Sequence, residues 1–125
     1  SVILVDTSIW IDHLRHGNAR LGALLQQQQV AAHPWIVGEL ACGNLANRRA
    51  ILELLRQLPQ LGLAADTEVL QFIERHRLMG RGVGYIDAHL LAACAIHHAM
   101  VWSRDRRLVE IATELRLAWS PTSPA

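Results

Sequence analysis

Val2-Ile3-Leu4-Val5-Asp6-Thr7-Ser8 is the stretch that decides the fold of this 125-residue chain. An apolar run without alternation is typical of a strand that is covered on both faces, as in a parallel sheet. Asp6 follows this run directly, and the hydroxyls of Thr7 and Ser8 can cap a helix. The stretch therefore predicts a buried parallel strand with an acid at its carboxyl end, where ligands bind in such sheets.

The rest of the chain repeats the alternation of strand and helix patterns. Further strands are expected at residues 30–32, 61–64, 99–102 and 117–119, with amphipathic or buried helices between them. This order predicts an α/β fold with three layers, α/β/α, around a central, mainly parallel sheet of four to five strands. We expect one domain over residues 1–119 and a disordered tail over residues 120–125, which contain Pro121 and Pro124.

Composition narrows the class of protein. The apolar share of 51% supplies one core in a chain too short for a second domain. The sequence contains neither a secretory leader nor an apolar run that could cross a bilayer, so a cytoplasmic protein without membrane association is expected. Its two cysteines, Cys42 and Cys94, lie in apolar helical stretches and are expected to be buried thiols.

Four carboxylates lie at the edges of strongly apolar segments, and they are Asp6, Glu39, Asp87 and Asp105. An ionised carboxylate is costly to bury unless a cation or hydrogen-bond donors compensate it. Glu39 is explained worst by a structural role, because it lies five residues after Pro34, too deep in its helix to stabilise the first turn. If the four acids converge, they form an all-oxygen site that suits Mg²⁺ or Mn²⁺ and favours phosphodiester chemistry.

Other patterns support weaker interpretations. The pairs His13 with His16 and His97 with His98 allow a zinc site or acid–base catalysis, although contacts at helix ends are the simpler interpretation. The glycines between residues 80 and 84 predict a turn, since no Lys-Ser or Lys-Thr follows as in a phosphate loop. Asp66 is interpreted as a helix cap. The absence of lysine excludes receiver domains and aspartate-nucleophile phosphatases, which use one near the phosphoryl group.

All 12 basic residues are arginine, and the net charge is only +1. Bulk charge therefore gives no evidence for a nucleic-acid partner, but arginine clusters suit phosphate oxygens. Arg104, Arg106 and Arg107 surround Asp105 and are the candidates for RNA binding; a second cluster spans residues 75–81. The alternative is GC-rich codon usage combined with solvated helix faces.

Four segments together resemble the PIN domain, and more narrowly the VapC-type ribonuclease toxins of bacterial toxin–antitoxin pairs. They are Val2 to Ser8, Gly38-Glu39-Leu40, Tyr85-Ile86-Asp87-Ala88 and Trp102-Ser103-Arg104-Asp105. The opening Asp-Thr-Ser and the helical stretch from Asp87 to Ala93 are fairly specific at this separation. The last segment often reads Thr-Arg-Asp in relatives, so Ser103 departs slightly from the pattern.

The resemblance implies a PIN-like ribonuclease domain whose acids are Asp6, Glu39, Asp87 and Asp105, with Ser8 and Ser103 as supporting hydroxyls. It implies a Mg²⁺- or Mn²⁺-dependent endoribonuclease that inhibits growth or translation as the toxin of a type II pair. One or two ions held by these acids would activate a water molecule against the RNA backbone. It also implies a cognate antitoxin, a homodimer, and a heterotetramer or larger complex with that antitoxin.

Two alternatives stay open. A catalytically silent PIN-like module could bind RNA or a protein, although a binder has no need for clustered acids. A DNA-directed nuclease of the same fold is disfavoured by the small size of the chain.

Overall fold

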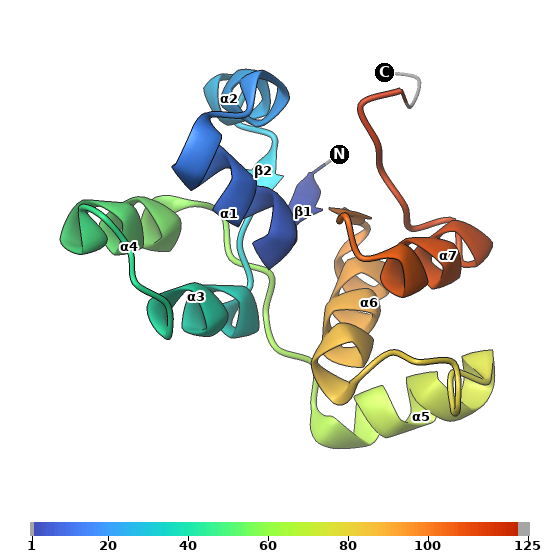
Figure 1. Ribbon diagram of the computed structural model, residues 1–125. Helices are drawn as coiled ribbons and strands as arrows, with labels where there is room; N and C mark the ends of the chain where they lie inside the picture. The colour runs from blue at the N-terminus through green and yellow to red at the C-terminus, as the bar shows by residue number, and fades with distance from the viewer. Residues whose placement is uncertain (1, 123–125) are drawn as a thin grey trace.

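The computed structural model describes residues 2–122, and its centre is a small parallel sheet (Figure 1). Strand β1 (Ile3–Val5) lies between β2 (Val30–Ala31) and β3 (Met100–Trp102), and both neighbours pair with it in parallel. All three residues of β1 are buried, which is the environment that the unbroken apolar run predicts. The α/β class and the parallel sheet are therefore confirmed.

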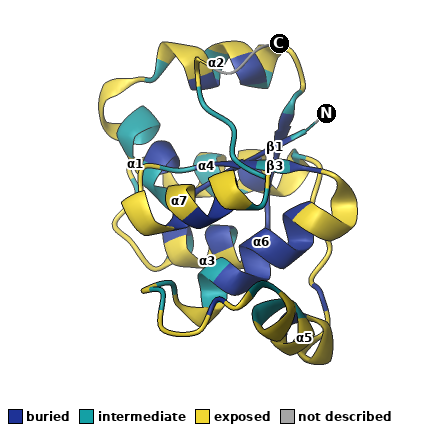
Figure 2. Ribbon diagram, turned by 90° about the vertical axis from the view of Figure 1, so that its right-hand side faces the viewer, coloured by how far each residue is buried: buried dark blue, intermediate teal, exposed yellow. Residues whose placement is uncertain are grey.

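Helices cover both faces of the sheet. Figure 1 shows α1, α3 and α4 on one side and α6 and α7 on the other, and Figure 2 shows how much of α6 is buried. The helices are α1 (Thr7–His16), α2 (Ala19–Gln26), α3 (Pro34–Ala41), α4 (Arg48–Gln57), α5 (Asp66–His76), α6 (Tyr85–His97) and α7 (Arg106–Glu114). Every residue from Ala88 to Cys94 is buried, because this stretch of α6 packs between the sheet and its neighbouring helices.

The fourth and fifth expected strands are reduced to single bridges. Residues 61–64 form no strand, and pairing at that edge is limited to a parallel bridge between Ala32 and Gln60. Pro59 precedes this bridge, and proline lacks the N–H that a longer ladder needs. At the other edge Ala118 bridges to Val101, and the chain then leaves the sheet towards a turn at Pro121.

The direction in which successive strands are added to the sheet reverses at β1. The chain passes from β1 to β2 on one side and later returns to β3 on the other. In open parallel sheets, the crevice beyond the carboxyl ends of the strands at such a point is the usual ligand site. Asp6 directly follows β1 and Ser103 directly follows β3, so both lie at this edge.

Three smaller expectations have different outcomes. Residues 123–125 lie outside the described residues, and the predicted disorder of the tail stays untested for them. No helix in the described part of the chain combines the length and the apolar character needed to cross a membrane. Both cysteines are free thiols; Cys94 is buried as expected, but Cys42 is exposed because α3 ends there at the surface.

Candidate active site

Sheet register brings Asp6 and Ser103 side by side. Val5 pairs with Trp102, so the next residue of each strand lies at the same level. The Ser103 hydroxyl donates to Asp6 Oδ2 at 2.6 Å, and the Ser8 hydroxyl donates to the same oxygen at 3.3 Å. Asp6 is buried, with 9% of its surface exposed. Its charge is therefore compensated by two hydroxyls, and its second oxygen, Oδ1, has no hydrogen bond among the described residues.

The same two hydroxyls also hold the segment that carries Asp105. The backbone N–H of Arg104 donates to Ser8 Oγ at 3.1 Å, and that of Asp105 donates to Ser103 Oγ at 2.9 Å. Asp105 in turn caps α7, because its Oδ1 accepts the backbone N–H groups of Arg107 and Leu108. Asp105 is exposed, contrary to the burial that its apolar neighbours suggested.

Glu39 reaches the edge of the sheet from α3 and is held by a residue that the sequence did not single out as a site residue. The Thr7 hydroxyl donates to Glu39 Oε1 at 3.0 Å. Neither Thr7 nor Ser8 caps α1, because their hydroxyls turn to Glu39 and Asp6 instead. Glu39 itself is exposed. A hydroxyl next to a helix start looks like a cap in sequence, so only the packing of α1 against α3 shows this role.

Asp87 completes the group and carries its clearest electrostatic signature. Burial first, and then the charges of Asp6 and Asp105 with a smaller effect from Glu39, raise the pKa of the Asp87 carboxyl to about 6. A hydrogen bond with the backbone of Gly84 opposes this rise. Asp87 therefore lies close enough to Asp6, Asp105 and Glu39 for their charges to disfavour its ionised form.

The donor set fits a hard divalent cation by its chemistry. Asp6, Glu39 and Asp105 each use one carboxylate oxygen for a hydrogen bond within the protein, and the other oxygen has none to any residue between 2 and 122. Among residues 2–122 no arginine forms an ion pair with any of the four acids. In the same residues, no three His, Cys, Asp or Glu side chains are grouped so as to hold a metal ion. Carboxylates repel one another when no cation lies between them, and a bound divalent cation would offset this repulsion.

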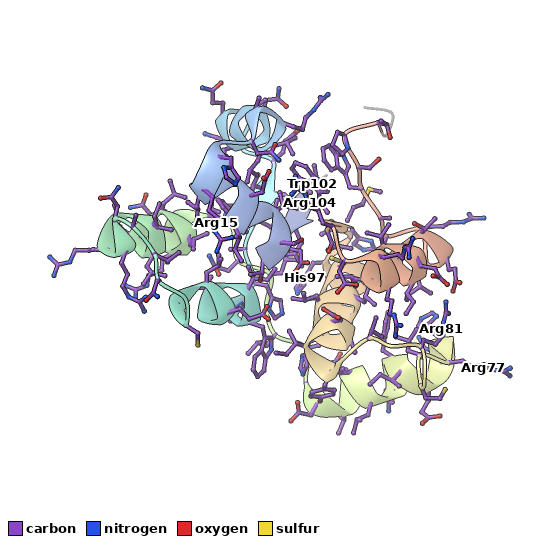
Figure 3. All side chains as sticks on the ribbon, in the orientation of Figure 1. Arg15, Arg77, Arg81, His97, Trp102 and Arg104 are labelled. Carbon is purple, nitrogen blue, oxygen red and sulfur yellow. The ribbon has the colours of Figure 1, made fainter. Side chains whose placement is uncertain are left out.

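The arginine candidates differ in their surroundings. Arg104 Nη2 lies 3.1 Å from Asp12 Oδ2 and the side chain stays 59% exposed; Figure 3 shows it between α1 and α7. Arg107 lies over Gly82, where an added Cβ would clash with its guanidinium. Arg81 pairs with Glu114 at 2.7 Å, far from Arg104 in Figure 3. Arg104 is thus the arginine of the predicted cluster whose side chain is fixed by an ion pair among the described residues.

Histidines form local contacts rather than the pairs considered from sequence. His13 Nδ1 accepts the backbone N–H of Asn18 at 3.0 Å, and His97 Nε2 lies 3.3 Å from the carbonyl oxygen of Gly62. Two buried histidines, His33 and His89, were not singled out in sequence, and apolar neighbours give no signal that separates them from core residues. Asp66, interpreted as a cap, instead accepts the Tyr85 hydroxyl from α6.

Comparisons with known proteins agree with this architecture. The profile of the PIN domain matches residues 3–114. Ribonuclease VapC32 of Mycobacterium tuberculosis, from two strains, is 43% identical over 118 residues, which cover 94% of this chain and 95% of that protein.

Solved structures show the same fold at low identity. A FitAB complex bound to the IR36 DNA fragment superposes with a TM-score of 0.62 at 19% identity, covering 90% of this chain and 91% of that chain. FitAcB from Neisseria gonorrhoeae also gives 0.62, at 21% identity over 90% and 94% of the two chains. PAE2754 from Pyrobaculum aerophilum gives 0.58, at 16% identity over 88% and 78%.

Proposed function

The chain belongs to the PIN-domain family and is of the VapC type, and on that premise we propose that it is the endoribonuclease toxin of a type II toxin–antitoxin pair. The observation that carries the proposal is that the charges of Asp6, Asp105 and Glu39 act on Asp87, in a chain that is 43% identical to a protein named a ribonuclease. We propose Mg²⁺ as the cofactor and Mn²⁺ as its substitute.

Asp6, Glu39, Asp87 and Asp105 would hold the ion. When bound, a divalent cation supplies Lewis-acid activation of water and stabilises charge on a phosphodiester during hydrolysis. The protein's own contribution is to keep the carboxylates oriented. Ser8 and Ser103 fix one oxygen of Asp6, and the cap of α7 fixes one oxygen of Asp105, which leaves the remaining oxygens for the ion.

RNA must approach this acidic edge with its negatively charged backbone. Arg104 is the leading candidate for a phosphate contact, because it neighbours Asp105 in the chain and its side chain, held by Asp12, stays exposed. Asn18 Nδ2 donates to the same Asp12 oxygen at 3.1 Å, which fixes that carboxylate in turn. Arg106 and Arg107 remain candidates, since both are exposed on the first turn of α7.

A cognate antitoxin is part of the proposal. A hollow of about 300 Å³ lies between α1, α3 and the segment before α4, lined by apolar side chains that include Ile11, Leu40 and Ile51, with Glu39 at its border. An apolar side chain of a partner would fit the hollow while a neighbouring basic side chain pairs with Glu39. A homodimer, a heterotetramer or larger complex with the antitoxin, and action in the cytoplasm belong to the same proposal.

The test is cleavage of structured RNA by the purified protein with Mg²⁺ or Mn²⁺ and with EDTA. We expect ion-dependent cleavage that Asp6→Asn and Asp87→Asn each abolish, while the exposed control Glu74→Gln retains it. Undiminished cleavage in EDTA would indicate a histidine mechanism. Tight RNA binding without any cleavage under all of these conditions would favour the catalytically silent module.

A further inference from the structure

Two exposed aromatic side chains lie against one buried histidine. The chain has four Trp, one Tyr and one Phe, and of these only Trp35 and Tyr85 are exposed, at 39% and 44%. Their ring centroids lie 5.5 Å and 4.7 Å from that of His89, which is 2% exposed. The three rings join the first turns of α3 and α6, and we call them the aromatic cluster.

Trp35 connects the aromatic cluster to Glu39, one of the acids. Trp35 precedes Glu39 by four residues on α3, so both lie on one face of that helix, about 6 Å apart along its axis. Tyr85 begins α6, the helix whose first turn also carries Asp87. The two helices that present acids at the edge of the sheet thus also present the exposed rings.

Hydrogen bonds hold the rings in place. The Tyr85 hydroxyl donates to Asp66 Oδ1 at 3.0 Å, and His89 Nε2 lies 3.5 Å from the same oxygen. The backbone N–H of Trp35 donates to His33 Nδ1 at 3.1 Å, which fixes the start of α3. Both ring nitrogens of His89 are buried without a hydrogen-bond partner among the described residues. Rings that are ordered before binding lose little entropy when a ligand covers them.

Charge decides which part of an RNA fits this surface. Four carboxylates repel phosphates, so contacts to the backbone alone are unfavourable beside them. A nucleobase is uncharged, and it stacks on an aromatic ring whatever its sequence. Such stacking requires an unpaired base, because the faces of a paired base are covered within a helix.

We propose that Trp35 and Tyr85 form a stacking site for an unpaired nucleobase that adjoins the phosphate bound at the acids. This inference rests on the proposed ribonuclease function. In this inference the aromatic cluster binds a base of the substrate, because the acids repel its phosphates. A second copy of this chain is the rival occupant of the same surface.

Binding is measured in the non-cleaving Asp87→Asn protein with a short, fluorescein-labelled single-stranded RNA of mixed sequence. Trp35→Leu is expected to weaken the affinity at least about ten-fold, and Trp35→Phe to restore most of it, since phenylalanine also stacks. Leu70→Ala, which shortens an exposed apolar side chain on α5, is the matched control and should leave the affinity unchanged.

An abasic series of the same RNA identifies the stacked base. One position should weaken binding when its base is removed, and that loss should disappear in Trp35→Leu, because the two changes remove one interaction. In cleavage assays Trp35→Leu should raise KM far more than it lowers kcat, with Mn²⁺ affinity unchanged.

Equal RNA affinity in Trp35→Leu and the parent protein would overturn the inference. The inference would also be overturned if Trp35→Leu lost RNA affinity and changed its molar mass, as measured by light scattering. A second copy of the chain would then be the molecule that covers the aromatic cluster. Failure of the wild-type protein to cleave any RNA with Mg²⁺ or Mn²⁺ would instead overturn the proposed function on which the inference rests.

Discussion

Replacing Asp87 with asparagine is expected to stabilise the metal-free protein at neutral pH. Burial and the charges of Asp6 and Asp105 raise the pKa of Asp87, so the folded state disfavours the ionised carboxylate. Asparagine has nearly the same shape and no charge, and it relieves both effects. The substitution should thus abolish activity and raise the free energy of unfolding together.

The pKa of Asp87 fixes the size and the pH window of this effect. A rise from 3.8 to about 6 corresponds to about 3 kcal/mol when the group is ionised, at about 1.4 kcal/mol per pKa unit. Because Asp87 is only partly buried, solvent screening lowers this figure, and we expect about 1 to 3 kcal/mol. Because the pKa is higher in the folded state, the free energy of unfolding falls as the pH rises from 3.8 to about 6. The advantage of Asp87→Asn should therefore be full at neutral pH and shrink towards about pH 4.

The assay is urea unfolding followed by tryptophan fluorescence, in EDTA, between about pH 4 and pH 8. Glu74→Gln serves as the control, because it removes an exposed carboxylate outside the group of acids. Saturating Mn²⁺ should stabilise the wild type more than the variant and so narrow or reverse the difference. A variant no more stable than wild type at neutral pH, or an advantage that does not change with pH, would refute the reasoning.

Three further predictions concern residues around the site. Thr7→Val should lower the affinity for Mn²⁺ about ten-fold because Glu39 loses its hydrogen bond, and Thr7→Ser should restore that affinity. Calorimetric titration measures the affinity of both variants and of the wild type. Equal affinity in all three proteins would contradict the role of Thr7 in orienting Glu39. Arg104→Gln should reduce the log–log salt slope of RNA binding by roughly one, whereas Arg77→Gln should not, and an unchanged slope would leave Arg104 as surface charge. Burial, aided by nearby histidines, lowers the pKa of His33 to about 4, so stability should fall by up to about 3 kcal/mol as pH drops from 6.5 towards 4. Urea unfolding of His33→Asn should show a smaller fall, and an equal one would mean that His33 is not the titrating group.

Local patterns were sufficient where burial and chain order decide the outcome. The unbroken apolar run before Asp6 can be stable only between two covering layers, and β1 occupies that position. The uniformly apolar stretch after Asp87 likewise predicted a helix buried on most sides, as α6 is. An acid directly after a central parallel strand must lie at the carboxyl edge of the sheet, so Asp6 could be placed without coordinates.

Local sequence patterns did not predict strand length or exposure where these depend on contacts between distant segments. Residues 61–64 and 117–119 have strand-like composition, but the length of a ladder depends on the neighbouring edge and on Pro59, and each edge gained one bridge. Apolar neighbours suggested burial for Glu39 and Asp105, yet both are exposed. Exposure depends on what packs against a residue, which its sequence neighbours do not specify.

The sequence by itself determined the α/β order and the buried central strand, and it supplied four acids as candidates for one site. Only the tertiary structure decided which hydroxyl serves which acid: Thr7 turns to Glu39, while Ser8 and Ser103 share Asp6. It also decided that Trp35 and Tyr85 meet over His89. The physical reason is that periodicity and burial are properties of one segment, whereas a hydrogen bond or a ring contact between segments depends on sheet register and helix packing.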